Sequence, residues 1–218
     1  MYFWHRGIKM REYDIFQMSN LHKMKKSNIP QYAECAALAY QNYPLFDYLL
    51  NGEYNYEIVK KIISASIYAM PNKVVGFSCD YDVNAALIFI PPYYTGSKTL
   101  PFLANGGIEL TVMSKPSIFL RLLNYEKYAM KLKKQYTDHA CWYLYNLVVK
   151  PEFQNQGYCS KLLKPMLSYL DRINKDCYLE THGEKNIALY EHFDFELLGT
   201  SYIPKTKINH YAMLRKAK

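Results

Sequence analysis

The sequence predicts a mixed α/β fold in which a twisted sheet is flanked by helices. The 218 residues suffice for one substantial core, and half of them are hydrophobic. Apolar residues recur at helical spacing through most of the first half, and short apolar runs typical of strands alternate with helical patterns in the second half. We therefore expect a single domain over residues 1–218, with its ligand site where strands end.

Helical spacing dominates the region before the first expected strands. Residues 29–50 predict two short helices that meet near residues 42–44, because a proline disfavours helix in the residue before it. Residues 56–70 predict a further helix that Pro71 ends.

A β-hairpin and a long loop follow. The apolar runs at 74–79 and 85–90 are joined by a turn-rich segment, which is the pattern of a hairpin. Residues 91–107 contain three prolines and three glycines and predict a long irregular segment. The remaining expected elements are a helix over 117–134, a strand over 142–149, a helix over 157–173, a strand over 176–180, a helix over 186–193 and two final strands.

The formal net charge of +8 favours an anionic partner, either nucleic acid or a phosphorylated small molecule. Basic residues are scattered in short runs such as 23–26 and 131–134, and no RNA-binding motif, zinc knuckle or clustered arginine face is present, so we expect no nucleic-acid partner. No run of 18 or more apolar residues occurs, and charge appears too early for a secretory signal. We expect a cytoplasmic protein with no membrane partner.

The cysteines give no sign of a disulfide framework or a metal site. They are five in number and form no CxxC pair: Cys35, Cys79, Cys141, Cys159 and Cys177. Reduced and mostly buried thiols are expected, and no metal.

A polar turn joins the strand over 142–149 to the helix that follows it. Its residues are Gln154, Asn155, Gln156, Gly157, Tyr158, Cys159 and Ser160. Such a junction directs unpaired backbone N–H groups to one place, where the helix dipole adds partial positive charge, and this suits a pyrophosphate. Gly157 would let the backbone approach the phosphates, and the Ser160 hydroxyl can donate to a phosphate oxygen. On these grounds alone, a plain helix-starting loop is an equal alternative.

The pattern Gln154-x-x-Gly157-x-Cys159 resembles the Q/R-x-x-G-x-G/A signature of the GNAT superfamily of N-acetyltransferases. Residues 178–181 and 186–195 are similar to the family's fifth strand, the helix after it and its YE-x-x-GF segment. The resemblance covers residues 142–215. Upstream, residues 44–50 and 90–92 loosely resemble the small-molecule branch that includes puromycin N-acetyltransferase.

Two positions depart from the family's pattern. Cys159 stands where Gly or Ala is usual, and Asp194 stands where a Gly usually precedes Phe. A Cys159 side chain directed at the pyrophosphate would reduce cofactor affinity, whereas one directed at the sheet would change nothing.

The resemblance implies the GNAT fold, a mixed, mostly antiparallel twisted sheet with flanking helices and a splayed central strand pair. It implies that the chain, as a monomer or homodimer, transfers the acetyl group of acetyl-CoA directly to a primary amine of a small-molecule acceptor. Residues 142–215 would form the acetyl-CoA-binding and catalytic half. A protein or peptide N-acetyltransferase and a non-catalytic acyl-CoA-binding sensor are the alternatives.

The resemblance also implies roles for single residues. Tyr190 would contact the cofactor sulfur and act as general acid toward the departing thiolate. The general base is not identified, and Glu180, His182 and Tyr145 are the candidates, with Glu180 taken as catalytic. The implied cofactor-binding set is Tyr190, Asn186, the strand residues Leu147, Val148 and Val149, which offer main-chain groups, and the loop from Gln154 to Ser160.

Overall fold

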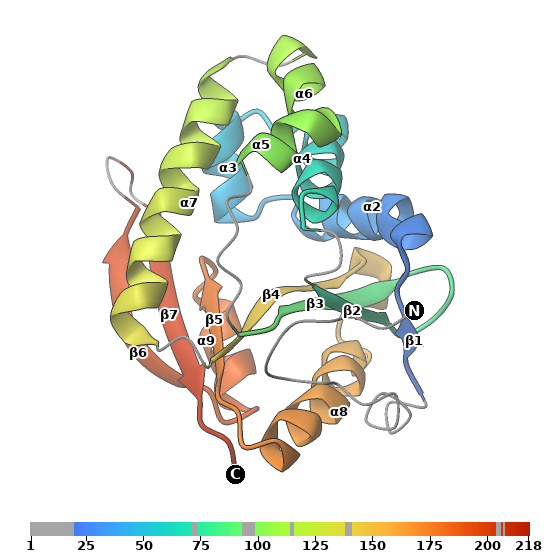
Figure 1. Ribbon diagram of the computed structural model, residues 1–218, viewed down its shortest axis with the longest axis vertical. Helices are drawn as coiled ribbons and strands as arrows, with labels where there is room; N and C mark the ends of the chain where they lie inside the picture. The colour runs from blue at the N-terminus through green and yellow to red at the C-terminus, as the bar shows by residue number, and fades with distance from the viewer. Residues whose placement is uncertain are drawn as a thin grey trace.

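The computed structural model describes residues 20–70, 74–92, 99–113, 116–137, 141–203, 206 and 208–218. The described strands form one seven-stranded sheet in the order β1-β2-β3-β4-β5-β7-β6 (Figure 1). Every neighbouring pair is antiparallel except β4 and β5, which are parallel. The strands are β1 (His22–Lys23), β2 (Val75–Ser78), β3 (Ala85–Ile90), β4 (Trp142–Val149), β5 (Cys177–Thr181), β6 (Glu196–Tyr202) and β7 (Asn209–Arg215).

Helices cover both faces of this sheet. In Figure 1 the helices α2 to α6 lie on one side of the sheet, α8 lies on the other, and α7 runs beside β6 and β7. The helices are α2 (Ile29–Ala39), α3 (Pro44–Leu50), α4 (Tyr56–Tyr68), α5 (Thr99–Phe102), α6 (Ile108–Met113), α7 (Pro116–Tyr136), α8 (Tyr158–Arg172) and α9 (Lys185–Glu191). Short turns of other helix types are η1 (Lys26–Asn28), η2 (Leu103–Gly107) and η3 (Pro151–Phe153). The expected mixed, mostly antiparallel α/β fold is confirmed.

Two buried layers lie on opposite faces of the sheet. The even-numbered residues of β3 pack with α2, α3 and α4, whereas its odd-numbered residues pack with α8. This alternation is the ordinary period of a strand with both faces covered. The residues that α8 buries recur every three or four positions and are Leu162, Leu163, Met166, Leu167, Tyr169 and Leu170. Each fully buried side chain of this size contributes about 1.5–3 kcal/mol.

The elements before β4 agree with the sequence except in one segment. The two short helices are α2 and α3, and Pro44 occupies the start of α3, where its missing N–H costs nothing. The hairpin of β2 and β3 is also present. The prediction of an irregular segment over 91–107 was wrong for residues 99–107, which are helical in α5 and η2. Pro101 lies in the first turn of α5, where proline is tolerated, and Gly106 takes a positive φ of 112° inside a kinked helix.

Three expectations lie outside the described residues. They concern the helix end at Pro71, the irregular conformation of residues 93–98, and the charged start of the chain that argued against a secretory signal. No described helix is both long and apolar enough to cross a membrane.

Candidate active site

The central strands β4 and β5 pair only along their first halves. Their register ends at Leu144 and Leu179, which leaves the β5-facing edge of the second half of β4 unpaired with β5. A bulge accompanies this change: Leu144 pairs with Phe89 of β3 and Asn146 with Ile88, so Tyr145 is the extra residue. The splayed strand pair that the resemblance implied is therefore present.

The backbone of β4 shows which groups face this opening. The N–H of Lys150 donates to the carbonyl of Asn84 across 2.9 Å and so points toward the β3 side. Because successive residues alternate in direction, the backbone groups of Leu147 and Val149 point to the open side. The side-chain amide of Gln154 donates to the Val149 carbonyl at 3.1 Å. The Val149 side chain is buried and that of Leu147 is half-buried, so these side chains pack within the protein. What the two residues present to the opening is therefore their main-chain groups.

The loop after β4 ends at Gly157, the N-cap of α8, whose φ of 79° lies in the left-handed region. No side chain of the described residues caps the helix, so the first-turn N–H groups are open to outside partners. Within the described part of the chain, no atom lies within 4 Å of the position that a Gly157 Cβ would occupy. Asn155 also has a positive φ, of 60°, which Asn tolerates better than most residues. The backbone here is exposed, uncapped and shaped to approach an anion.

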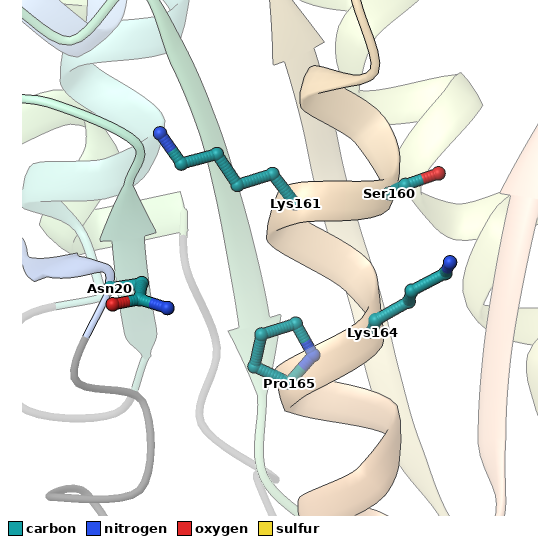
Figure 2. Close-up of a pocket in the computed structure, with 5 residues that line it drawn as sticks. All are labelled: Asn20, Ser160, Lys161, Lys164 and Pro165. Atoms are coloured by element: carbon teal, nitrogen blue, oxygen red, sulfur yellow. The ribbon is translucent and has the colours of Figure 1, made fainter.

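Basic side chains lie beside this loop. Ser160, Lys161, Lys164, Pro165 and Asn20 line a surface hollow of about 610 Å³ (Figure 2). In that view Ser160 and Lys164 project to one side of α8 and Lys161 to the other. Lys161 and Lys164 add positive charge to the first two turns of α8, whose dipole is positive at the Gly157 end. The residues present therefore fit the phosphates of a coenzyme A moiety.

Cys159 is half-buried and packs against the core between α8 and the sheet, so its side chain faces the sheet. Burial raises the pKa of its thiol, which disfavours the reactive thiolate. The other four cysteines are buried, as expected. Asp194, the second departure from the signature, has a φ of 65°, so it adopts the left-handed conformation for which glycine is usual.

Under the direct acetyl transfer that the resemblance implies, no enzyme nucleophile is needed, so we predict that Cys159→Ala keeps turnover within about 2-fold of the wild type. Steady-state acetyl transfer would measure this. An acetyl thioester found on Cys159 by mass spectrometry, combined with loss of turnover in the alanine variant, would contradict it.

Tyr190 and Asn186 lie on successive turns of α9. The Asn186 side-chain amide donates to Thr181 Oγ1 at 2.9 Å, which ties the start of α9 to the end of β5. Tyr190 is 8% exposed and stacks edge-on against Phe195 with ring centroids 5.8 Å apart. Burial, helped by the neighbouring Tyr43, raises its pKa well above the usual value, so the hydroxyl stays protonated and able to donate.

Glu180 is a carboxylate held inside the protein. Its side chain is 2% exposed and accepts from the hydroxyls of Tyr178 at 2.9 Å and Tyr143 at 3.1 Å. A basic group also lies nearby, since His210 Nε2 is 3.8 Å from Glu180 Oε2. Tyr145, another candidate base, is half-buried and packs edge-on to Tyr143.

His182, another candidate base, is buried. Its backbone N–H donates to the Tyr43 hydroxyl at 3.0 Å, and its Nδ1 lies 3.3 Å from the same oxygen. Burial, with a smaller contribution from His210, lowers the pKa of His182 to about 3. The imidazole is therefore neutral in the folded protein at physiological pH.

This burial makes stability depend on pH. Between about pH 6.5 and the folded pKa of about 3, the unfolded chain binds a proton at His182 that the folded chain does not. The free energy of unfolding should therefore fall as pH falls through that window, by up to about 1.4 kcal/mol per pH unit from this group. Urea unfolding at about pH 7 and about pH 5 measures the effect, and His182→Gln should flatten the dependence. As a control, replacing the exposed His192 by Gln should leave the pH dependence of the unfolding free energy unchanged. An equal pH dependence in the wild type and in His182→Gln would contradict the prediction.

Two residues of this region were missed by sequence reasoning. Tyr43, between α2 and α3, reaches across to Thr181 Oγ1 at 3.2 Å and to His182. His210, on β7, lies beside Glu180 and His182. Neither belongs to a motif, and only the tertiary fold brings them to β5.

Comparisons with known proteins agree with this architecture. Residues 123–195 match the family model described as Acetyltransferase (GNAT) family. An uncharacterized N-acetyltransferase of Schizosaccharomyces pombe is 33% identical over 87 residues, or 40% of this chain, and the match spans only 34% of that relative's length.

Solved structures share the fold at low sequence identity. A structure titled histone acetyltransferase HPA2 and related acetyltransferase, from Corynebacterium glutamicum, is 16% identical, with a TM-score of 0.61 over 91% of this chain and 96% of that one. Arylalkylamine N-acetyltransferase 2 from Aedes aegypti is 13% identical, with a TM-score of 0.57 over 91% of this chain and 98% of that one. At such identities the likeness concerns the fold, and the fold is that of the GNAT proteins. The family-model match covers residues 123–195 of the 218-residue chain, which include β4, the loop after it, α8, β5 and α9.

Proposed function

We propose that this chain transfers the acetyl group of acetyl-CoA to a primary amine of a small-molecule acceptor by direct attack. The observation that carries the proposal is the open edge of β4, which leads to the start of α8. That helix begins at Gly157 and has no side-chain cap among the described residues. One continuous backbone surface, from Leu147 to Ser160, can then pair with an extended amide-bearing arm and receive phosphates at its end.

The cofactor-binding residues follow from that surface. The backbone groups of Leu147 and Val149 would pair with the pantetheine arm, and the intervening Val148 continues the strand. The loop from Gln154 to Ser160 would hold the pyrophosphate, with Lys161 and Lys164 nearby. A backbone N–H of β4 would also stabilise negative charge on the thioester oxygen during attack. Asn186 would hold the start of α9 against β5, through its bond to Thr181.

The residues that act on protons would be Tyr190 and Glu180. A primary amine of pKa about 10.4 is neutral in only about one molecule in 2,500 at pH 7, so a group must take its proton. Glu180 is the one acidic candidate at the end of β5 among the described residues, and its negative charge would draw the amine proton inward. Tyr190 would donate toward the departing sulfur. Both are buried, which strengthens their electrostatic interactions.

The acceptor side favours a small molecule over a polypeptide. Tyr125 and Tyr128 of α7 pack their rings on His182 and His210, at centroid distances of 5.3 Å each, and cover this side of β5 and β7. Arg121 of the same helix donates to the carbonyls of Tyr48 and Leu49 and fastens α7 to α3. A helix fastened across the site leaves less room for a peptide than an open groove would.

An acceptor panel with acetyl-CoA tests the proposal. Primary amines of varied size, basic peptides and protein N-termini would each be incubated with the chain, and acetylated product would be measured by mass spectrometry. Acetylation of small amines above the other classes supports the proposal. Preference for peptides would replace it with a protein N-acetyltransferase, and acetyl-CoA binding without any product would replace it with a sensor.

A further inference from the structure

Three histidine nitrogens are buried in one place without a hydrogen-bond partner among the described residues. They are Nδ1 and Nε2 of His210 and Nε2 of His182. His210 is 0% exposed, and its ring meets that of His182 edge to face with centroids 5.0 Å apart. Buried polar atoms are nearly always paired, so an unpaired group of this kind calls for an explanation.

A buried carboxylate completes the cluster. Glu180 Oε2 lies 3.8 Å from His210 Nε2, and the partners of Glu180 are otherwise the hydroxyls of Tyr143 and Tyr178. A proton on His210 would convert this contact into an ion pair and give the carboxylate a counter-charge. No described group of three or more His, Cys, Asp or Glu side chains is arranged to hold a metal ion.

A chain of polar contacts connects the cluster to the proposed reaction centre. The Tyr43 hydroxyl lies 3.2 Å from Thr181 Oγ1 and 3.3 Å from His182 Nδ1. Thr181 Oγ1 accepts a hydrogen bond from the side-chain amide of Asn186. Asn186 lies one helical turn before Tyr190. Tyr43 therefore stands between the end of β5, where the acceptor would react, and the histidine pair.

We propose that His210 holds the proton that the acceptor amine gives up, with Tyr43 and His182 as its path and Glu180 as its counter-charge. The inference rests on the proposed acetyl transfer. His210 acts through His182 and does not touch the acceptor.

The proton balance is as follows. As the amine nitrogen bonds to the acetyl carbon and the carbon–sulfur bond breaks, the nitrogen loses one proton. The Tyr43 hydroxyl takes it while passing its own proton to His182 Nδ1, which we assign as the accepting nitrogen. Because His182 Nε2 and the His210 nitrogens have no hydrogen-bond partner among the described residues, His182 would release its Nε2 proton to His210 through one bridging water. Tyr190 meanwhile gives its proton to the departing sulfur. After the products leave, His210 passes its proton back to His182 Nε2, His182 Nδ1 returns one to Tyr43, and Tyr43 releases one into the emptied acceptor site, where a proton restores Tyr190. Each group then has its starting tautomer.

The position of Glu180 makes His210 the place where the proton stays, because Glu180 Oε2 lies 3.8 Å from His210 Nε2. The groups that face the two rings are Tyr43, Tyr125 and Tyr128, and those that face Glu180 are Tyr143 and Tyr178. Burial holds the pKa of His182 to about 3, and it raises the pKa of Tyr43, Tyr125, Tyr143 and Tyr178. His182 thus passes a proton without keeping it, and the tyrosines stay neutral.

The test is a pH–rate profile of kcat/KM with saturating acetyl-CoA and the panel amine that the wild type acetylates fastest. His210→Asn and Tyr43→Phe should each lose about 10-fold near pH 7, and the loss should shrink to under about 3-fold near pH 10, where water and hydroxide can take the proton. Acetyl-CoA affinity, measured by calorimetry, should not change. Tyr43→Phe keeps its ring and so tests the path even if His210→Asn fails to fold.

Tyr54→Phe is the matched control. It also removes one tyrosine hydroxyl, but this hydroxyl donates to the Ala37 carbonyl and lies outside the path. Its profile should follow the wild type at every pH. The inference is overturned if Tyr43→Phe or folded His210→Asn keeps the wild-type profile, or loses the same factor at every pH as a merely structural change would. If the wild type acetylates no amine at all, the proposed function fails instead.

Discussion

Tyr190→Phe is expected to lower turnover by about 10-fold to 1,000-fold while acetyl-CoA affinity stays nearly constant. The substitution keeps the ring that packs edge-on against Phe195 and removes only the hydroxyl. An interaction made only as the sulfur departs acts on the chemical step and leaves ground-state binding alone. Turnover would be measured with a good acceptor under conditions in which chemistry limits the rate.

The size of this effect follows from proton affinities. The reference pKa of a phenol is about 10 and that of a thiol about 8.5, so full proton transfer to the thiolate is uphill by about 2 kcal/mol in solution. Burial raises the pKa of Tyr190 further. A hydrogen bond to the developing charge should therefore matter more than complete transfer, which favours the lower part of the usual range for positioned acids.

Tyr54→Phe provides the control for hydroxyl loss. Tyr54 donates to the Ala37 carbonyl, away from β4 and β5, and its loss should leave turnover unchanged. Near-normal turnover of Tyr190→Phe would mean that Tyr190 only packs and that water protonates the leaving group.

Local sequence patterns were sufficient to predict most elements of the fold. The strand over 142–149 coincides with β4, and the helix expected over 157–173 differs from α8 by one residue at each end. These segments have strong periodicity and clear start signals, such as Gly157 before α8. The prediction of an irregular segment was wrong for residues 99–107 because Pro101 and Gly106 were interpreted as helix breakers. A proline in the first turn of a helix and a glycine at a kink are both compatible with helical structure.

The acceptor side could not be predicted in the same way. Tyr43, Glu180 and His210 come from the α2–α3 connection, β5 and β7, and β7 reaches β5 only through long-range antiparallel pairing. No spacing in the sequence encodes that contact. Among 23 tyrosines, nothing local distinguishes Tyr43 from those that merely pack. The sequence also does not show that His210 is buried, so its lack of hydrogen-bond partners among the described residues could be recognised only from the structure.

Gly157→Val is expected to weaken acetyl-CoA binding at least about 10-fold, or about 1.4 kcal/mol. Two effects combine. Gly157 has a φ of 79°, which a β-branched residue adopts only under strain, so the loop would shift. The open space within 4 Å of its absent Cβ is where we place the pyrophosphate, and a valine side chain would fill it.

Gly52 offers a matched control for the strain alone. Its φ is 82°, and it lies after α3, away from α8. Gly52→Val should lower stability, as Gly157→Val does, but should leave acetyl-CoA affinity unchanged. The comparison separates damage to the fold from damage to the site.

The most direct measurement is a calorimetric titration of acetyl-CoA into the wild type, Gly157→Val and Gly52→Val, each first shown to be folded. Our account predicts that the wild type and Gly52→Val bind alike and that Gly157→Val binds at least about 10-fold more weakly. Equal affinity in all three proteins would remove the loop at the start of α8 from the binding site, and with it the basis of the proposed function.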